Sequence, residues 1–79
     1  MASGSSFTIE GVKVIAYGFK DFSLEEAQLY FDYVDTNVEI PNNESLSTIS
    51  ISPMKNNRVA IRLTTDFGYS QILIRGVQH

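Results

Sequence analysis

Six residues in the last third of the chain have side chains suited to binding a charged or aromatic partner. They are Arg58, Arg62, Tyr69, Gln71, Leu73 and Arg75. The three guanidinium forks match phosphate and carboxylate groups, and the tyrosine ring can stack on a base or anchor a protein contact. The leucine adds apolar area of the kind that a self-association contact uses. The same residues are also typical of an outward sheet face kept polar for solubility, and that interpretation stays open.

A second candidate surface is acidic. Residues 21–54 contain seven Asp or Glu and no Lys or Arg, whereas residues 55–79 contain four cations and one acid. We expect Glu25, Asp32 and Asp35 to lie on the exposed side of a helix, where they would attract a basic partner. The arginine surface of a second copy is one such partner, and an ordinary solvated helix face is the alternative.

Catalytic chemistry is poorly represented. The chain has no cysteine, and its single histidine is the last residue, His79, where we expect a frayed tail and no positioned base. Isolated glycines form no phosphate-binding loop, and the acids lack the spacing of a calcium loop. The sequence therefore predicts no enzyme, no metal, no cofactor and no small-molecule substrate.

One amphipathic helix is expected in the middle of the chain. Ser23 and Glu26 have the spacing of a capping box, in which each side chain satisfies an unpaired amide of the first turn. Apolar residues follow at helical spacing from Leu24 to Val34. Loop-forming residues begin after Val34, so the helix is predicted to stop near that position.

Strands are expected on both sides of this helix. Residues 7–17 are predicted to form a hairpin turning at Glu10 and Gly11, or one long strand with a bulge there. Residues 48–52, 58–64 and 71–75 alternate with period two, and turn-forming segments separate them. The predicted fold class is α+β: a small antiparallel sheet with one amphipathic helix packed on one face. Residues 1–6 are expected to be a disordered head and residues 7–79 one domain.

The period-two alternation also predicts which side chains point away from the helix. The expected open face consists of Thr48, Ser50, Arg58, Ala60, Arg62, Thr64, Tyr69, Gln71, Leu73 and Arg75. Which edge of the three later strands receives the first segment stays open.

A competing interpretation makes residues 67–75 a second helix, which gives the element order that opens an RNA-recognition motif. That family stacks bases on aromatic side chains of its first and third strands, whereas this chain offers Ile15, Arg58 and Ala60 there. We therefore infer no family resemblance.

These observations favour a small non-enzymatic protein-interaction module of the adaptor or inhibitor type, with self-association as one form of the contact. The alternative is a nucleic-acid-binding module that uses Arg58, Arg62 and Arg75. A net charge of −3 and a pI near 4.8 weigh against it. Apolar stretches are far shorter than the roughly 20 residues that span a bilayer, and the absence of cysteine fits an intracellular, cytoplasmic location.

Overall fold

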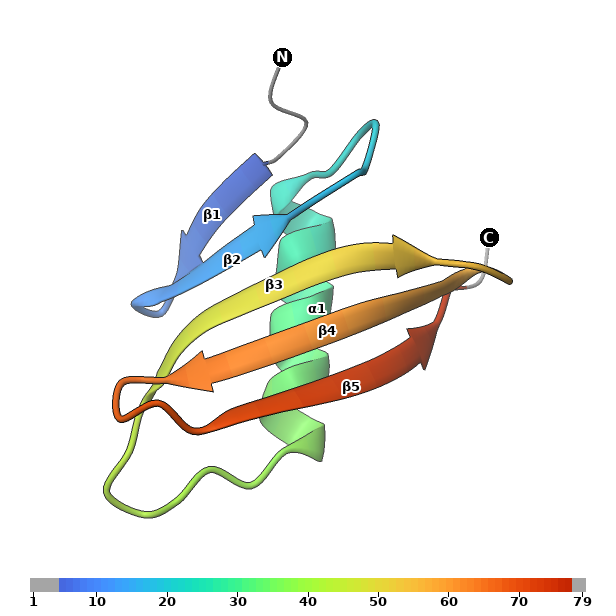
Figure 1. Ribbon diagram of the computed structural model, residues 1–79. Helices are drawn as coiled ribbons and strands as arrows, with labels where there is room; N and C mark the ends of the chain where they lie inside the picture. The colour runs from blue at the N-terminus through green and yellow to red at the C-terminus, as the bar shows by residue number, and fades with distance from the viewer. Residues whose placement is uncertain (1–4, 78–79) are drawn as a thin grey trace.

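The computed structural model describes residues 5–77 as one five-stranded sheet with one helix across one of its faces (Figure 1). The fold class predicted from the sequence is confirmed. In chain order the elements are β1 Ser5–Ile9, β2 Val12–Ala16, α1 Leu24–Asn37, β3 Leu46–Met54, β4 Arg58–Thr65 and β5 Ser70–Gly76.

The first two strands form the predicted hairpin. Glu10 and Gly11 connect them with φ angles of 50° and 81°, so both lie in the left-handed region that a tight two-residue hairpin turn requires. Glycine adopts that region without strain, which explains its position here. Strand β1 begins at Ser5, so two residues of the expected head belong to the sheet. Residues 1–4 lie outside the described part of the chain.

The helix begins at the predicted cap and runs further than expected. The Ser23 hydroxyl accepts a hydrogen bond of 3.2 Å from the Glu26 amide, as the capping box predicts. The helix then continues to Asn37, three residues beyond the predicted end. The Asn37 side-chain amide donates to the Tyr33 carbonyl at 2.8 Å, so it satisfies a carbonyl that the helix end leaves unpaired.

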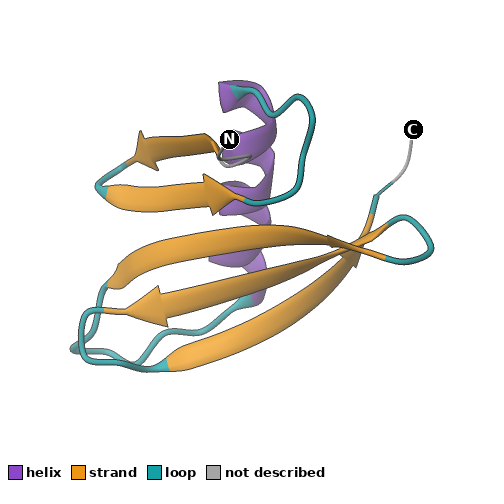
Figure 2. Ribbon diagram, turned by 45° about the horizontal axis from the view of Figure 1, so that its top comes forward, coloured by secondary structure: helices purple, strands orange, loops and turns teal. Residues whose placement is uncertain are grey.

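The order of the strands follows the chain, and one neighbouring pair is parallel. Strand β2 pairs in parallel with β3, with Val14 opposite Ile49, and the other three pairings are antiparallel. Parallel neighbours need a long crossover, which α1 supplies. Figure 2 shows α1 against one face of the sheet. Within the sheet, the hairpin β1–β2 lies beside the three strands β3–β5. The first segment therefore joins the β3 edge. Among residues 5–77 no strand pairs with the outer side of β5, so β5 is a free edge.

The core lies between α1 and the sheet. Ile49, Ile51, Ile61 and Leu63 are completely buried. Aromatic rings close one end of this layer: Phe22 stacks on Tyr30 at a centroid distance of 6.0 Å. Among residues 5–77, no helix combines the length and the apolar character needed to cross a membrane.

Candidate interaction surface

The connection between β4 and β5 decides which residues of β5 face the helix. Asp66, Phe67 and Gly68 form the loop, and the Thr65 amide donates to the Tyr69 carbonyl at 2.9 Å across it. Gly68 has a φ of 93°, which suits the left-handed position of a three-residue hairpin loop. With this loop length, odd-numbered residues of β4 pair with odd-numbered residues of β5. Directly paired residues share a face, so the buried side of β4 continues into the odd-numbered side of β5.

Four of the six predicted sheet-face residues consequently lie on the helix side, and their placement on the open face was wrong. They are Tyr69, Gln71, Leu73 and Arg75. Leu73 is opposite the buried Ile61 and packs against the core. The Tyr69 hydroxyl donates to Gln71 Oε1 at 2.8 Å on the same side. Period-two alternation could not identify the buried face of β5, because apolar residues occur at both its odd-numbered and its even-numbered positions.

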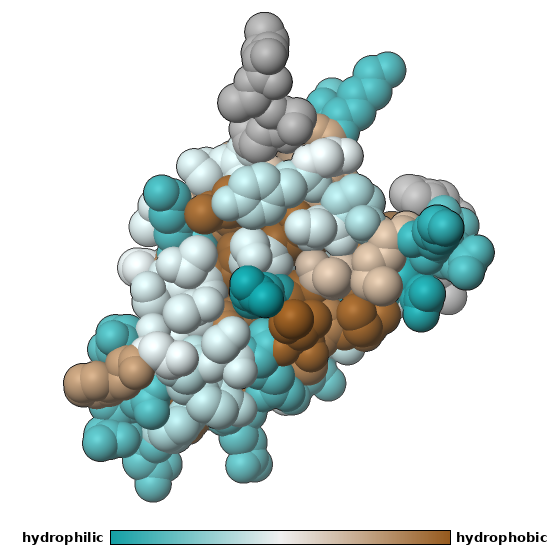
Figure 3. Space-filling view, in the orientation of Figure 1, coloured by the Kyte–Doolittle hydropathy of each residue, from teal (hydrophilic) through white to brown (hydrophobic). Residues whose placement is uncertain are grey.

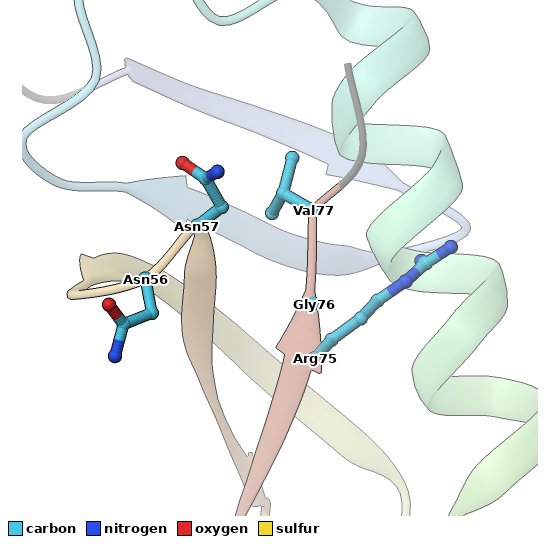
Figure 4. A pocket seen from close by; sticks show the side chains of 5 residues that line it. All are labelled: Asn56, Asn57, Arg75, Gly76 and Val77. Atoms are coloured by element: carbon cyan, nitrogen blue, oxygen red, sulfur yellow. The ribbon is translucent and has the colours of Figure 1, made fainter.

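Arg75 is engaged within the molecule. Its guanidinium carbon lies 4.5 Å from the centroid of the Tyr33 ring and 5.8 Å from that of Tyr30, both on α1. Figure 4 shows the Arg75 side chain extended from β5 toward the helix. A cation over aromatic rings is attracted to their negative faces, so this arginine joins the free edge strand to α1.

Tyr30 itself is expected to make stability sensitive to high pH. Burial, followed by the nearby Glu26 carboxylate, raises the pKa of Tyr30 above the ordinary value of 10.0, and Arg75 partly opposes this. As pH rises above 10.0, Tyr30 loses its proton more readily in the unfolded chain than in the folded one, so the free energy of unfolding falls. Below pH 10.0 Tyr30 is protonated in both states, and its ionisation does not change stability. Urea unfolding of wild type and Tyr30→Phe on either side of pH 10.0 should show a smaller fall for the variant.

Tyr17→Phe, which removes a hydroxyl from a half-exposed ring, is the matched control for this comparison. Equal losses of stability in wild type and Tyr30→Phe across that pH range would contradict the raised pKa of Tyr30.

The open face of the sheet has an apolar area at its β5 edge that the sequence did not lead us to expect. Ile72 and Ile74 of β5 are 52% and 46% exposed. Arg62 of β4 is opposite Ile72, and Ala60 is opposite Ile74. We call these four residues the β5 patch. Figure 3 shows this face, with hydrophobic side chains gathered over β5 and paler, more polar residues over most of the other strands.

The rest of the open face is hydroxyl-rich and cationic. Lys13, Arg58 and Arg62 are exposed, and the pairing register places all three on this face. The Arg58 Nε also donates to the Lys55 carbonyl at 3.3 Å in the adjoining turn. None of the five described strands contains an Asp or Glu. Arg58 and Arg62 are therefore the two predicted residues that the structure keeps on the open face.

The predicted acidic residues lie on the opposite side of the molecule. Glu25, Asp32 and Asp35 are exposed on α1, on the side turned away from the buried residues of the helix. Asp32 accepts a hydrogen bond of 3.0 Å from Gln28, and Leu29 is 60% exposed beside it. The two candidate surfaces thus lie on opposite sides of the molecule, except at the start of α1, where Arg58 lines a cleft together with Glu26.

Two open clefts lie beside the turn between β3 and β4. The larger, about 700 Å³, is lined by Asn56, Asn57, Arg75, Gly76 and Val77 (Figure 4). The smaller, about 370 Å³, lies against the start of α1. Its two carboxylates are the exposed Asp21 and the half-buried Glu26, with Lys20 and Arg58 nearby in the lining. The lining therefore mixes acidic and basic side chains and has no single charge sign that would select an anion or a cation.

Metal binding finds no support in the described part of the chain, where no three His, Cys, Asp or Glu side chains come together. His79 lies outside the described residues.

No protein-family model, curated protein or solved structure matches this chain.

Ile72 and Ile74 are the surface residues that sequence reasoning missed. The available signal was the number of residues in the loop between Thr65 and Tyr69, the pair that closes the β4–β5 hairpin. A three-residue loop pairs Ile61 with Leu73 and so turns the two isoleucines outward, whereas a connection with one residue more or fewer would reverse the assignment.

Proposed function

We propose that this chain is a non-enzymatic protein-interaction module, of the adaptor or inhibitor type, that binds a protein partner through the β5 patch. The observation that carries the proposal is the pair of half-exposed isoleucines on a free edge strand. Contiguous exposed apolar groups mark interaction sites, because covering them removes apolar surface from water. Arginine is one of the residue types that most often dominate binding energy at protein interfaces. Arg62 lies directly opposite Ile72 in the sheet.

The chemistry of the patch indicates what a partner should present. Aliphatic side chains would pack on Ile72 and Ile74, and a carboxylate would pair with the Arg62 fork. A partner segment in extended form could also bond to the main chain of β5, as in other complexes that add a strand to a sheet edge. We place this activity inside the cell, since the fold is built without cysteine.

Nucleic-acid binding is the second candidate, and the cationic open face favours it. Lys13, Arg58 and Arg62 have no acidic neighbour in the strands. Against this, Arg75 is directed to the other face, and the net charge of −3 gives little general attraction for phosphates. The acidic side of α1, with Glu25, Asp32 and Asp35, is the remaining candidate surface, for a basic partner.

Selection from a displayed library of random peptides tests the proposal. Wild type is compared with Ile72→Ser/Ile74→Ser and with Leu29→Ser, which removes an even more exposed apolar side chain from the helix. We expect peptides with alternating aliphatic residues and a nearby acid to bind wild type and Leu29→Ser. The Ile72→Ser/Ile74→Ser variant should lose this binding, which should tolerate added salt.

Three outcomes would redirect the assignment. Peptides that require Leu29 and ignore the two isoleucines would move the binding site to α1. Salt-sensitive binding of labelled RNA or DNA that Arg58→Glu/Arg62→Glu abolishes would establish the nucleic-acid alternative. Selection of no peptide that depends on Ile72 and Ile74 would contradict the β5 patch as a protein-binding site.

A further inference from the structure

Within residues 5–77, the free edge of β5 presents unpaired backbone groups next to the β5 patch. Hydrogen-bonded pairs alternate along antiparallel strands. The Thr65 amide bonds to the Tyr69 carbonyl at 2.9 Å and the Val77 amide to the Asn57 carbonyl at 2.6 Å, so the odd-numbered residues of β5 bond to β4. The residues between them direct their N–H and C=O groups outward. They are Ser70, Ile72, Ile74 and Gly76.

This edge lacks the features that usually keep two sheets apart. Natural edge strands are protected by lysine, proline, bulges or short length. Strand β5 has seven residues, and its register with β4 is regular throughout. None of its four outward-bonding residues is charged or proline. The opposite edge, β1, has five residues and turns Ser6 and Thr8 to the open face.

The outward-bonding residues are also self-complementary. A symmetric dimer requires that the same surface match itself around a two-fold axis. The strand is nearly symmetric about Leu73, with an isoleucine on each side and small residues, Ser70 and Gly76, at the ends. Antiparallel pairing of two β5 strands around Leu73 places Ile72 opposite Ile74 of the second copy and Ser70 opposite Gly76. Every outward N–H and C=O of the strand then has a partner.

The side chains of the two β5 strands are also compatible in this antiparallel register. Four isoleucines, two from each copy, would meet on the open face and cover one another. On the helix side Arg75 would face Gln71 of the second copy, so the two arginines are not opposed. The acids that give the chain its net charge of −3 lie outside the strands and therefore outside the seam.

We propose that two copies of this chain associate through antiparallel pairing of their β5 strands, with the two-fold axis at Leu73, and join two five-stranded sheets into one. The inference rests on the proposed function, because it names a second copy as the partner of the β5 patch. The free strand edge selects this occupant, since it satisfies the backbone groups and the isoleucines together.

Paired charge substitutions test both the contact and its register. In Ile72→Lys/Ile74→Lys each of the two former isoleucine pairs across the seam becomes lysine against lysine. In Ile72→Lys/Ile74→Glu each lysine faces a glutamate of the second copy. Sedimentation velocity up to submillimolar protein should show dimers for wild type and for the lysine–glutamate variant, and loss of the dimer for the double-lysine variant. Far-UV circular dichroism confirms that both variants fold.

A single cysteine gives an independent measurement, since the chain has none of its own. Leu73→Cys places two thiols opposite each other at a non-hydrogen-bonded pair, where the Cα atoms are about 4.5 Å apart and a disulfide can form. Mild oxidation should cross-link Leu73→Cys and leave Leu29→Cys, on the exposed side of α1, largely uncross-linked.

The following results would overturn the dimer. Wild type could remain monomeric at the highest concentration, the double-lysine variant could dimerise like wild type, or the lysine–glutamate variant could be as monomeric as the double-lysine variant. Failure of the dimer is distinguishable from failure of the proposed function. A monomeric wild type that still selects peptides through Ile72 and Ile74 retains the protein-binding site and loses only the second copy as its partner.

Discussion

Replacing Ile61 by alanine should lower the free energy of unfolding by about 2 to 5 kcal/mol. Ile61 is completely buried on β4, between β3 and β5, and faces the core beneath α1. The substitution removes apolar atoms from a packed interior and leaves a cavity that the surrounding strands cannot fully close. Urea unfolding followed by circular dichroism measures the loss.

Ile72→Ala is the matched control for this prediction. It deletes the same atoms from the neighbouring strand, at a side chain that is 52% exposed. The expected loss is below about 1 kcal/mol, because little of the removed surface was buried. Both variants are measured on dilute protein, where mass action disfavours self-association. Similar losses at the two positions would mean that the assignment of the two sheet faces is wrong.

The difference between these isoleucines bears on function. A side chain that contributes little to folding, and yet exposes apolar surface on a strand edge, is better explained by a contact with another molecule. The proposed role of Ile72 and Ile74 therefore depends on their having a small effect on stability.

Replacing Thr65 by valine should lower the free energy of unfolding by about 2 to 3 kcal/mol, although the side chain keeps its size. Thr65 is 3% exposed at the end of β4. Its hydroxyl donates to Glu44 Oε1 and accepts a hydrogen bond of 3.0 Å from the Tyr69 amide. Valine leaves both partners without the hydroxyl, and a partly buried polar group without a partner is costly.

The same variant should loosen the loop that orients β5. Asp66 supports this loop from the other side, since its amide donates to the Ser45 carbonyl at 3.0 Å and its Oδ1 accepts from the Ser45 amide at 3.0 Å. Faster hydrogen exchange at the Tyr69 amide is the local readout, and urea unfolding is the global one. Thr65→Ser, which retains the hydroxyl, should lose clearly less stability. A Thr65→Val protein as stable as wild type would contradict the role of this hydroxyl.

Local chemistry was sufficient for much of the fold. The Ser23 cap, the turn at Glu10 and Gly11, and the strands near 48–52, 58–64 and 71–75 depend on neighbouring residues, and the structure confirms each of them. The end of α1 was placed too early because Asn37 supplies a terminal hydrogen bond that loop propensity does not reveal.

The candidate surface was predictable only in part. The sequence by itself determined the charged residues, the helix that carries the acids and the outward alternation of Arg58 and Arg62 with the buried residues of β4. Tertiary structure decided that the hairpin joins β3 in parallel and that β5 turns Ile72 and Ile74 outward. The physical reason is that period-two alternation defines two faces of a strand without saying which one is covered. That choice depends on the pairing register and on which residues close each loop, and contacts between strands establish both.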